Sequence, residues 1–191
     1  MNLCDQYKLM HQQGAFKGYS LLPHVEDIAK LVDRHYAKTL LDYGCGKGLQ
    51  YIDKKVHEAW GGIMPTLYDP HVDKFSMKPS EKFDGVIFTD VLEHIPEHEI
   101  NKTWLDVINY GKEYGFIFAT ICVREAKKKL PDGRNCHLTV KSKEWWLNKL
   151  IEFDTNNKFK KEWRKINDNF YSVAVNTYTE FCDSWYVKFV E

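Results

Sequence analysis

Residues 39–48 (TLLDYGCGKG) constrain the fold of this chain more than any other stretch. The first three of them form a short apolar run, long enough for a buried strand, and Asp42 closes it. Gly44, Gly46 and Gly48 then stand at alternate positions, before the helix-like segment LQYIDKKV. A strand, a glycine turn and a helix together let the backbone approach a ligand closely. The helix N-terminus would add free N–H groups and partial positive charge for an anionic group.

The class of ligand follows from what this motif lacks. A phosphate-binding P-loop needs glycine in place of Leu41 and a hydroxyl residue in place of Gly48. The dinucleotide fingerprint needs its third glycine where Leu49 stands. The pattern that remains, Asp-x-Gly-x-Gly-x-Gly after a first strand, resembles that of the class I S-adenosylmethionine-dependent methyltransferases.

In that family, the acidic residue and the glycine turn hold the methionine end of the cofactor. The resemblance implies that Asp42 reaches the cofactor's ammonium group through water. It also implies that Gly44 and Gly46 leave room for the cofactor's chain, with Gly48 in the same cofactor-binding turn. A tight strand-to-helix turn without a ligand is the alternative, because isolated glycine motifs are weak signals.

A second acidic residue stands where the glycine turn predicts one. The run 65–68 indicates a second strand, ended by Asp69 and Pro70, and Asp69 lies 21 positions past Gly48 (69 − 48). An acidic side chain about 20 residues on, at the end of the second strand, can accept hydrogen bonds from both ribose hydroxyls. The resemblance assigns this cofactor-binding position to Asp69 and Pro70. A turn made by Asp-Pro is the alternative.

The segment FDGVIFTDVLEHIPEHEI is the second part of the resemblance. Residues 83–89 form an apolar strand, whose end in this family lies beside the methionine and sulfonium of the cofactor. The resemblance therefore places Thr89, Asp90 and Val91 against the cofactor. His94 and its neighbour Glu93 face either the substrate or a hydrogen-bond network within the domain, and a structural role is slightly favoured for His94.

One region of the chain departs from the family pattern, and another is expected to shape the acceptor site. Only 12 positions separate Pro70 from Lys82, so the usual helix and third strand are shortened or lost, and no adenine-binding residue is assigned. The irregular loop 124–141 follows the next strand, at the edge where open α/β sheets bind ligands. There Arg134 could fix an anionic group of the acceptor, and His137 could remove its proton. The lysine run 127–129 is better explained as a solvated surface.

Composition limits the classes of protein and partner. The 191 residues suit one domain, and the formal net charge of +0 provides no general attraction to nucleic acid or an anionic membrane. No apolar run approaches the roughly 18 residues of a spanning helix. Five cysteines without CxxC spacing indicate reduced thiols in a cytoplasmic protein, not a disulfide framework. They also indicate no zinc site, so no metal is expected.

The order of elements predicts an α/β fold: a Rossmann-like open, mostly parallel sheet with helices on both faces and a C-terminal antiparallel hairpin at about 158–166 and 169–178. We expect one methyltransferase domain over 1–191. Its segment 1–36, with Tyr19 as a substrate contact, would cap the site, and 124–141 would form the acceptor loop. The alternating segment 185–190 (WYVKFV) predicts an extra edge strand or a homodimer contact.

The function expected from these motifs is S-adenosylmethionine-dependent methyl transfer to an oxygen or nitrogen of a small-molecule acceptor. His137 is the candidate base and His94 the second candidate. A nucleic-acid methyltransferase is one alternative, although residues 89–96 (TDVLEHIP) lack the Asn/Asp-Pro-Pro-aromatic tetrapeptide of enzymes that act on base amino groups. A non-catalytic cofactor-binding or scaffold protein is the other.

Overall fold

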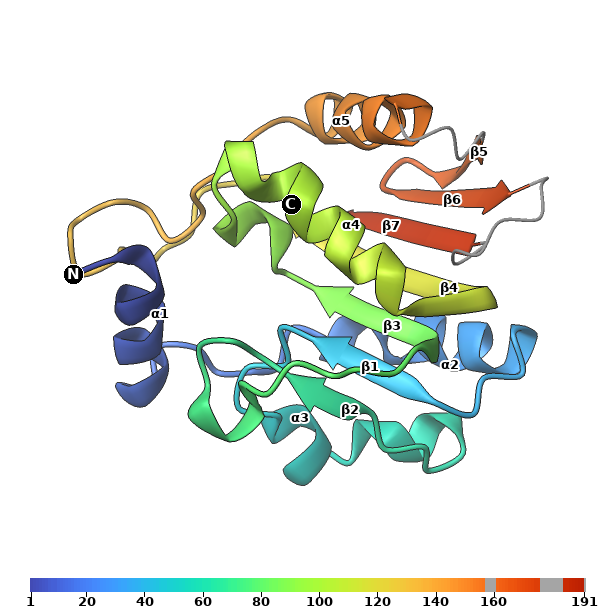
Figure 1. The fold of residues 1–191 in the computed structure, drawn as a ribbon, viewed down its shortest axis with the longest axis horizontal. Helices are drawn as coiled ribbons and strands as arrows, with labels where there is room; N and C mark the ends of the chain where they lie inside the picture. Colours follow the sequence, from blue (N-terminus) through green and yellow to red (C-terminus); the bar gives the residue numbers. More distant parts are fainter. Residues whose placement is uncertain (157–160, 176–183, 191) are drawn as a thin grey trace.

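The computed structural model describes residues 1–156, 161–175 and 184–190. Its centre is a seven-stranded sheet in the order β2-β1-β3-β4-β7-β6-β5 (Figure 1). The strands are β1 (Leu40–Tyr43), β2 (Thr66–Tyr68), β3 (Phe83–Thr89), β4 (Gly111–Cys122), β5 (Lys161–Asn167), β6 (Phe170–Val175) and β7 (Ser184–Val190). The helices are α1 (Leu3–Gln12), α2 (Val25–Arg34), α3 (Leu49–Ile52), α4 (Ile100–Tyr110) and α5 (Lys143–Asn156).

Parallel pairing connects the strands β2, β1, β3, β4 and β7. The expectation of a Rossmann-like α/β fold with a largely parallel sheet is confirmed by these five strands. At the far edge, β5 pairs antiparallel with β6, and β6 pairs antiparallel with β7. Parts of the two stretches in which the sequence predicts a hairpin, 158–160 and 176–178, lie outside the described residues.

The predicted position of the last strand is wrong. Residues 184–190 form β7, which is hydrogen-bonded to β4 on one side and to β6 on the other, so it is neither an edge strand nor a free surface for a dimer. The physical reason is burial on both faces of the sheet. Trp185 and Val187 are fully buried in one apolar cluster, and Tyr186 is buried in another.

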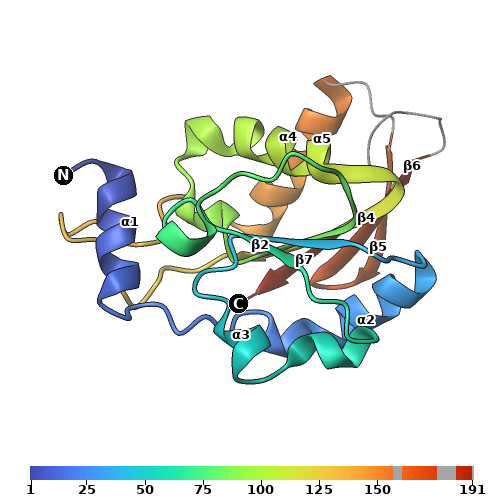
Figure 2. The same ribbon diagram turned by 60° about the horizontal axis from the view of Figure 1, so that its bottom comes forward.

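Helices cover both faces of the sheet, as predicted (Figure 2). On one face, α4 and α5 bury their apolar side chains in a cluster with β3, β4 and β7, which includes Trp104, Trp146 and Trp185. On the other face, α2 and the 3-10 segment Val56–Trp60 pack on β1 and β4. Ile28, Leu31 and Val32, on one face of α2, are buried in this core.

Between β2 and β3 the chain forms only one short 3-10 turn, Asp73–Phe75, which confirms that the usual helix and third strand are missing. The predicted helical segment LQYIDKKV, residues 49–56, is also shorter than expected. It is divided into the four-residue α3 and a 3-10 segment, because Lys55 adopts a left-handed backbone with φ of 47°. A helix of one turn carries a smaller aligned dipole than the expected longer helix.

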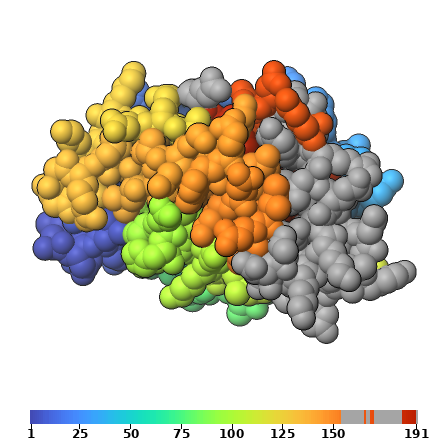
Figure 3. All heavy atoms as spheres, turned by 90° about the horizontal axis from the view of Figure 1, so that it is seen from above, coloured from blue at the N-terminus to red at the C-terminus, as the bar shows by residue number. Residues whose placement is uncertain are grey.

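The N-terminal helix α1 lies away from the sheet and against the loop 124–141 (Figure 1). Tyr7 and Met10 of α1 share a small buried cluster with Leu130 and Cys136 of the loop. In the space-filling view, the loop (yellow) likewise covers part of the N-terminal segment (blue) (Figure 3). Among the described helices, none combines the length and apolar character needed to cross a membrane.

Candidate functional site

The carboxyl ends of the parallel strands border a cavity of about 850 Å³. Its floor is made by the turns that follow β1, β2 and β3, and its roof by residues of the N-terminal segment and of the loop 124–141. Ten residues singled out in the sequence line it: Tyr19, Gly44, Gly46, Asp69, Pro70, Thr89, Asp90, Val91, His94 and His137. Asp42, Gly48 and Arg134 do not border it.

The glycine turn after β1 is required by two close approaches. Gly44 has φ of 84°, and a Cβ at this position would lie 2.4 Å from Cγ2 of Val91, at the end of β3. Gly48 has φ of 65°, and its Cβ would lie 2.8 Å from Cδ1 of Leu67 in β2. Gly44 therefore lets the tips of β1 and β3 converge at the cavity, whereas Gly48 serves packing against β2.

Asp42 lies behind the turn rather than in the cavity. Its Oδ2 accepts hydrogen bonds from Tyr51 Oη at 2.8 Å and from Gln50 Nε2 at 3.1 Å. Burial raises the pKa of this carboxyl to about 7, although the two hydrogen bonds oppose the shift. Asp42 can therefore interact with a ligand's ammonium group only electrostatically, across the intervening turn. The strength of this interaction depends on pH, because the carboxyl group gains or loses its proton near neutral pH.

Asp69, at the end of β2, does line the cavity. Its Oδ2 accepts a hydrogen bond from the backbone N–H of Gly46 at 2.9 Å, and its Oδ1 accepts one from the N–H of His71 at 2.8 Å. The carboxylate thus joins the second strand to the glycine turn. Each oxygen keeps a further lone pair with which it can accept a hydroxyl proton of a ligand.

The end of β3 supplies the next wall of the cavity. Thr89 is buried and lies within hydrogen-bond distance of Ser20, at 3.3 Å between the hydroxyl oxygens. Asp90 has a left-handed backbone, with φ of 54°, and its Oδ1 accepts a hydrogen bond from Thr120 Oγ1 at 2.7 Å. Burial raises the pKa of Asp90, against the opposing hydrogen bond from Thr120. This strained turn directs the polar atoms after β3 into the cavity.

Two histidines, His94 and His137, meet in the wall of the cavity. The rings of His94 and His137 lie 4.8 Å apart, edge to face. Nδ1 of His94 is 2.9 Å from the carbonyl oxygen of Cys136, and Nδ1 of His137 is 2.6 Å from that of Arg124. Burial, followed by the nearby His137, lowers the pKa of His94 to about 3, so its ring is neutral at physiological pH.

Glu93, whose role the sequence left open, is fully buried beside these histidines. Its Oε1 accepts a hydrogen bond from the N–H of Cys122 at 3.0 Å, which joins the end of β3 to that of β4. Burial, together with the neighbouring Asp90, holds its pKa well above the usual range. The sequence signal that could have indicated a role for Glu93 in the site is its position directly before His94, which lines the cavity.

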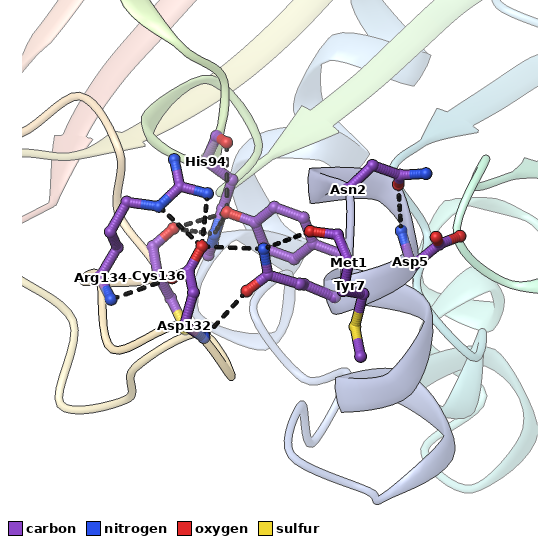
Figure 4. Close-up of polar contacts among 9 residues, drawn as sticks. Met1, Asn2, Asp5, Tyr7, His94, Asp132, Arg134 and Cys136 are labelled. Atoms are coloured by element: carbon purple, nitrogen blue, oxygen red, sulfur yellow. Dashed lines mark hydrogen bonds and ion pairs between the residues drawn. The ribbon is translucent and has the colours of Figure 1, made fainter.

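The sequence predicted a cap from segment 1–36, but Tyr7 and His11 were not among the residues expected to line the cavity. The hydroxyl of Tyr7, on α1, donates to the carbonyl oxygen of Cys136 at 2.7 Å and lies against His94 (Figure 4). His11 and Phe16 also line the cavity, with ring centroids 4.8 Å apart. Tyr19 reaches the cavity, but its hydroxyl donates to Asp53. No local pattern distinguishes Tyr7 from an ordinary helix-face residue.

Arg134, which was expected to bind an anionic group of the acceptor, binds Asp132 of its own loop instead. Its guanidinium donates twice to Oδ2 of Asp132, at 2.9 and 2.7 Å, and the same oxygen accepts from Nε2 of Gln6 at 2.8 Å (Figure 4). These bonds fasten the loop to α1, and the guanidinium does not line the cavity. Lys127 and Lys128 border the cavity mouth but are exposed, as expected of a solvated run.

The residues present fit an adenosyl amino acid. The volume lies within the roughly 300–1,000 Å³ of typical small-molecule sites, and Gly44 and Gly46 leave open the space that side chains would fill. Asp42 and Asp69 lie on neighbouring parallel strands, where Asp42 pairs with Leu67 and Tyr43 with Tyr68.

Comparison with known proteins supports this assignment independently. A family model described as a methyltransferase domain matches residues 21–173, which include the glycine turn, Asp69 and the end of β3. Comparisons with curated proteins and with solved structures gave no match. The family match covers well over half of the chain. The chain therefore belongs to the class I S-adenosylmethionine-dependent methyltransferases, enzymes that use this cofactor as methyl donor.

Proposed function

We propose that this enzyme methylates an oxygen or nitrogen atom of a small-molecule acceptor. The observation that carries the proposal is the pair of imidazoles, His94 and His137, at one end of a roofed cavity. Basic side chains adjacent to a cofactor's electrophile suit an acceptor that must lose a proton. A roof made of α1 and the loop 124–141 suits a molecule small enough to be enclosed, and the net charge of +0 disfavours nucleic acid.

The cofactor would occupy the end of the cavity at the glycine turn. We propose that the amino-acid chain of the cofactor passes along Gly44 and Gly46. Asp42 would stabilise the ammonium group of the cofactor electrostatically, across the turn. Asp69 would accept hydrogen bonds from the ribose, with Pro70 beside it. Thr89, Asp90 and Val91 would lie near the sulfur, since all three line the cavity at the end of β3. Gly48 contributes through packing alone.

Bound at this end, the cofactor supplies an electrophilic methyl group on its sulfonium. The chain's own contribution is to hold the acceptor atom in line with the methyl–sulfur bond and to keep water out. A carbonyl oxygen only accepts hydrogen bonds, so Nδ1 of His137 carries the proton that it shares with Arg124. In this tautomer Nε2 is the nitrogen that can accept a proton, and we propose it as the atom that takes the acceptor's proton.

The experiment compares His137→Ala with His98→Ala, a control on the exposed segment Glu97–Glu99. Both variants are incubated with methyl-labelled cofactor and fractionated small metabolites, and S-adenosylhomocysteine binding is measured by calorimetry. We expect His137→Ala to lower turnover by about 10²–10⁴-fold, the contribution of general acid–base groups, while cofactor affinity stays unchanged. His98→Ala should match the wild type in both measurements.

Three outcomes would contradict the proposal. Equal turnover of His137→Ala and wild type with the true acceptor would remove His137 from this role. Methyl transfer only to RNA or DNA would replace the small-molecule acceptor with a nucleic acid. Binding of S-adenosylhomocysteine without transfer to any fraction would support a non-catalytic scaffold.

We also propose a cytoplasmic location, because Cys4, Cys45, Cys122 and Cys136 are free thiols in the described part of the chain. Cys182 lies outside the described residues. The expectation of a homodimer has lost its basis, since it rested on β7 as an exposed edge strand.

A further inference from the structure

Three side chains that could ligate a cation converge at the acceptor end of the cavity. Glu93, His94 and His137 each place one potential ligand atom within 4.8 Å of the others. They come from two segments far apart in sequence: the turn after β3 and the loop 124–141. His94 and His137 line the cavity, so a cation held here would be reached from it.

The hydrogen bonds of the two histidines leave one nitrogen atom of each ring available. Each Nδ1 must carry a proton, because its partner is a backbone carbonyl oxygen, of Cys136 for His94 and of Arg124 for His137. In this tautomer the lone pair that can bind a cation lies at Nε2. Histidines that bind metals almost always donate their other ring N–H to a carbonyl or carboxylate, which fixes the ring and its tautomer. Both histidines already have this arrangement.

Glu93 supplies an independent observation. Its side chain is fully buried, and within the described residues its Oε2 has no hydrogen-bond partner, whereas Oε1 is occupied by the N–H of Cys122. Buried polar atoms are normally hydrogen-bonded or bound to a metal, so an oxygen without a partner indicates a ligand that completes this site.

We propose that Glu93, His94 and His137 bind a divalent transition-metal cation at the acceptor end of the cavity. Two imidazoles and one carboxylate form a ligand set typical of zinc, and imidazole also suits iron and nickel. Three protein ligands leave a position open, as in catalytic rather than structural sites. The sequence argument against a metal considered only the spacing of the cysteines, which take no part here.

The consequence for the reaction rests on the proposed function. With an acceptor hydroxyl in the open position, the cation lowers the pKa of that hydroxyl. The O–H bond breaks and the proton passes to solvent, the oxygen forms a bond to the methyl carbon, and the carbon–sulfur bond breaks to leave a neutral thioether. This narrows the proposed function in two respects: His137 contributes as a ligand of the cation and no longer as the base, and the acceptor is an alcohol or phenol.

The test measures metal binding by the metal-stripped full-length protein, without cofactor or acceptor. Zinc(II), manganese(II), iron(II), cobalt(II) and nickel(II) are titrated by calorimetry into wild type, Glu93→Gln and His137→Ala. Two control variants, Glu97→Gln and His98→Ala, replace the same residue types on an exposed neighbouring turn. We expect one site in the wild type and both controls, with affinity at least about tenfold lower in Glu93→Gln and His137→Ala, since loss of even an outer partner has this effect.

Cobalt(II) adds a direct readout, because its visible absorption reports the coordination of the bound ion. Circular dichroism and S-adenosylhomocysteine binding establish that each variant is folded. Absence of a site for all five cations in protein that binds S-adenosylhomocysteine would overturn the inference, as would equal affinity in Glu93→Gln, His137→Ala and wild type. Stoichiometric binding with the expected loss supports it even if no methyl transfer is found, so it fails separately from the proposed function.

Discussion

Replacing Gly44 with alanine tests the feature on which the cofactor end of the site depends. The backbone there has φ of 84°, and the new Cβ would lie 2.4 Å from Cγ2 of Val91. A matched control is Gly62→Ala, because Gly62 has a similar φ of 78° but nothing within 4 Å of the added carbon. The two variants share the same backbone strain and differ only in the steric contact.

The magnitudes follow from these two contributions. An alanine in the left-handed region costs about 1–2 kcal/mol, partly offset by roughly 0.4–1 kcal/mol from the less flexible unfolded chain. Gly62→Ala should therefore lower the free energy of unfolding by about 1 kcal/mol. Overpacking adds typically about 1–3 kcal/mol, and Val91 is β-branched, so it escapes the contact poorly by rotation. Gly44→Ala should thus cost about 2–4 kcal/mol.

Thermal unfolding followed by circular dichroism measures the difference. For a domain of this size, about 1 kcal/mol lowers the midpoint by roughly 2–4 °C, so Gly44→Ala should unfold several degrees below Gly62→Ala. The double variant Gly44→Ala/Val91→Ala removes the contact and should recover about 1–3 kcal/mol relative to the sum of the single changes. Equal midpoints for Gly44→Ala and Gly62→Ala, or additivity with Val91→Ala, would refute the close approach of β1 and β3.

Two further predictions concern buried titratable groups. The pKa of Asp42 is about 7 when folded and near 3.8 when unfolded, so the folded state binds the extra proton and stability falls as pH rises through this window, by up to about 4 kcal/mol. Asp42→Asn should lose this dependence in urea unfolding between pH 4 and 8; an unchanged slope would contradict it. The pKa of His94, about 3 when folded and 6.5 when unfolded, acts in the opposite direction: stability is complete above pH 6.5 and falls towards pH 3, by up to about 5 kcal/mol. Nuclear magnetic resonance should find this ring neutral at pH 5, and a charged ring there would contradict the burial.

Several local features were predictable because neighbouring residues decide them. Residues 83–89 form β3 with the predicted bounds, since a short apolar run can be satisfied only inside a sheet. Likewise, the alternate glycines predict a turn with left-handed backbone, and Gly44 and Gly46 both adopt it. The spacing of 21 residues brought Asp69 to the glycine turn, where it binds the N–H of Gly46.

Contacts between distant segments were not predictable from periodicity. The hydrogen bond from Tyr7 to the carbonyl of Cys136 joins residues 129 positions apart, and the β7 strand enters the middle of the sheet because its two faces are both apolar. Arg134 was assigned to an anion by its residue type, but a carboxylate two positions away satisfies it first. Residue chemistry indicates what a side chain can bind, not which partner lies nearest.

The amino-acid sequence by itself determined the first strand with its glycine turn, the second strand, and the two carboxylates, Asp42 and Asp69, at the ends of these strands. It thereby also determined the cofactor that they imply, because each of these features depends on short-range spacing. Only the tertiary structure decided that Asp42 lies behind the cavity, that α1 closes the roof, and that Glu93 meets both histidines. These arrangements arise from packing between elements far apart along the chain, and their energies come from burial that no local pattern records.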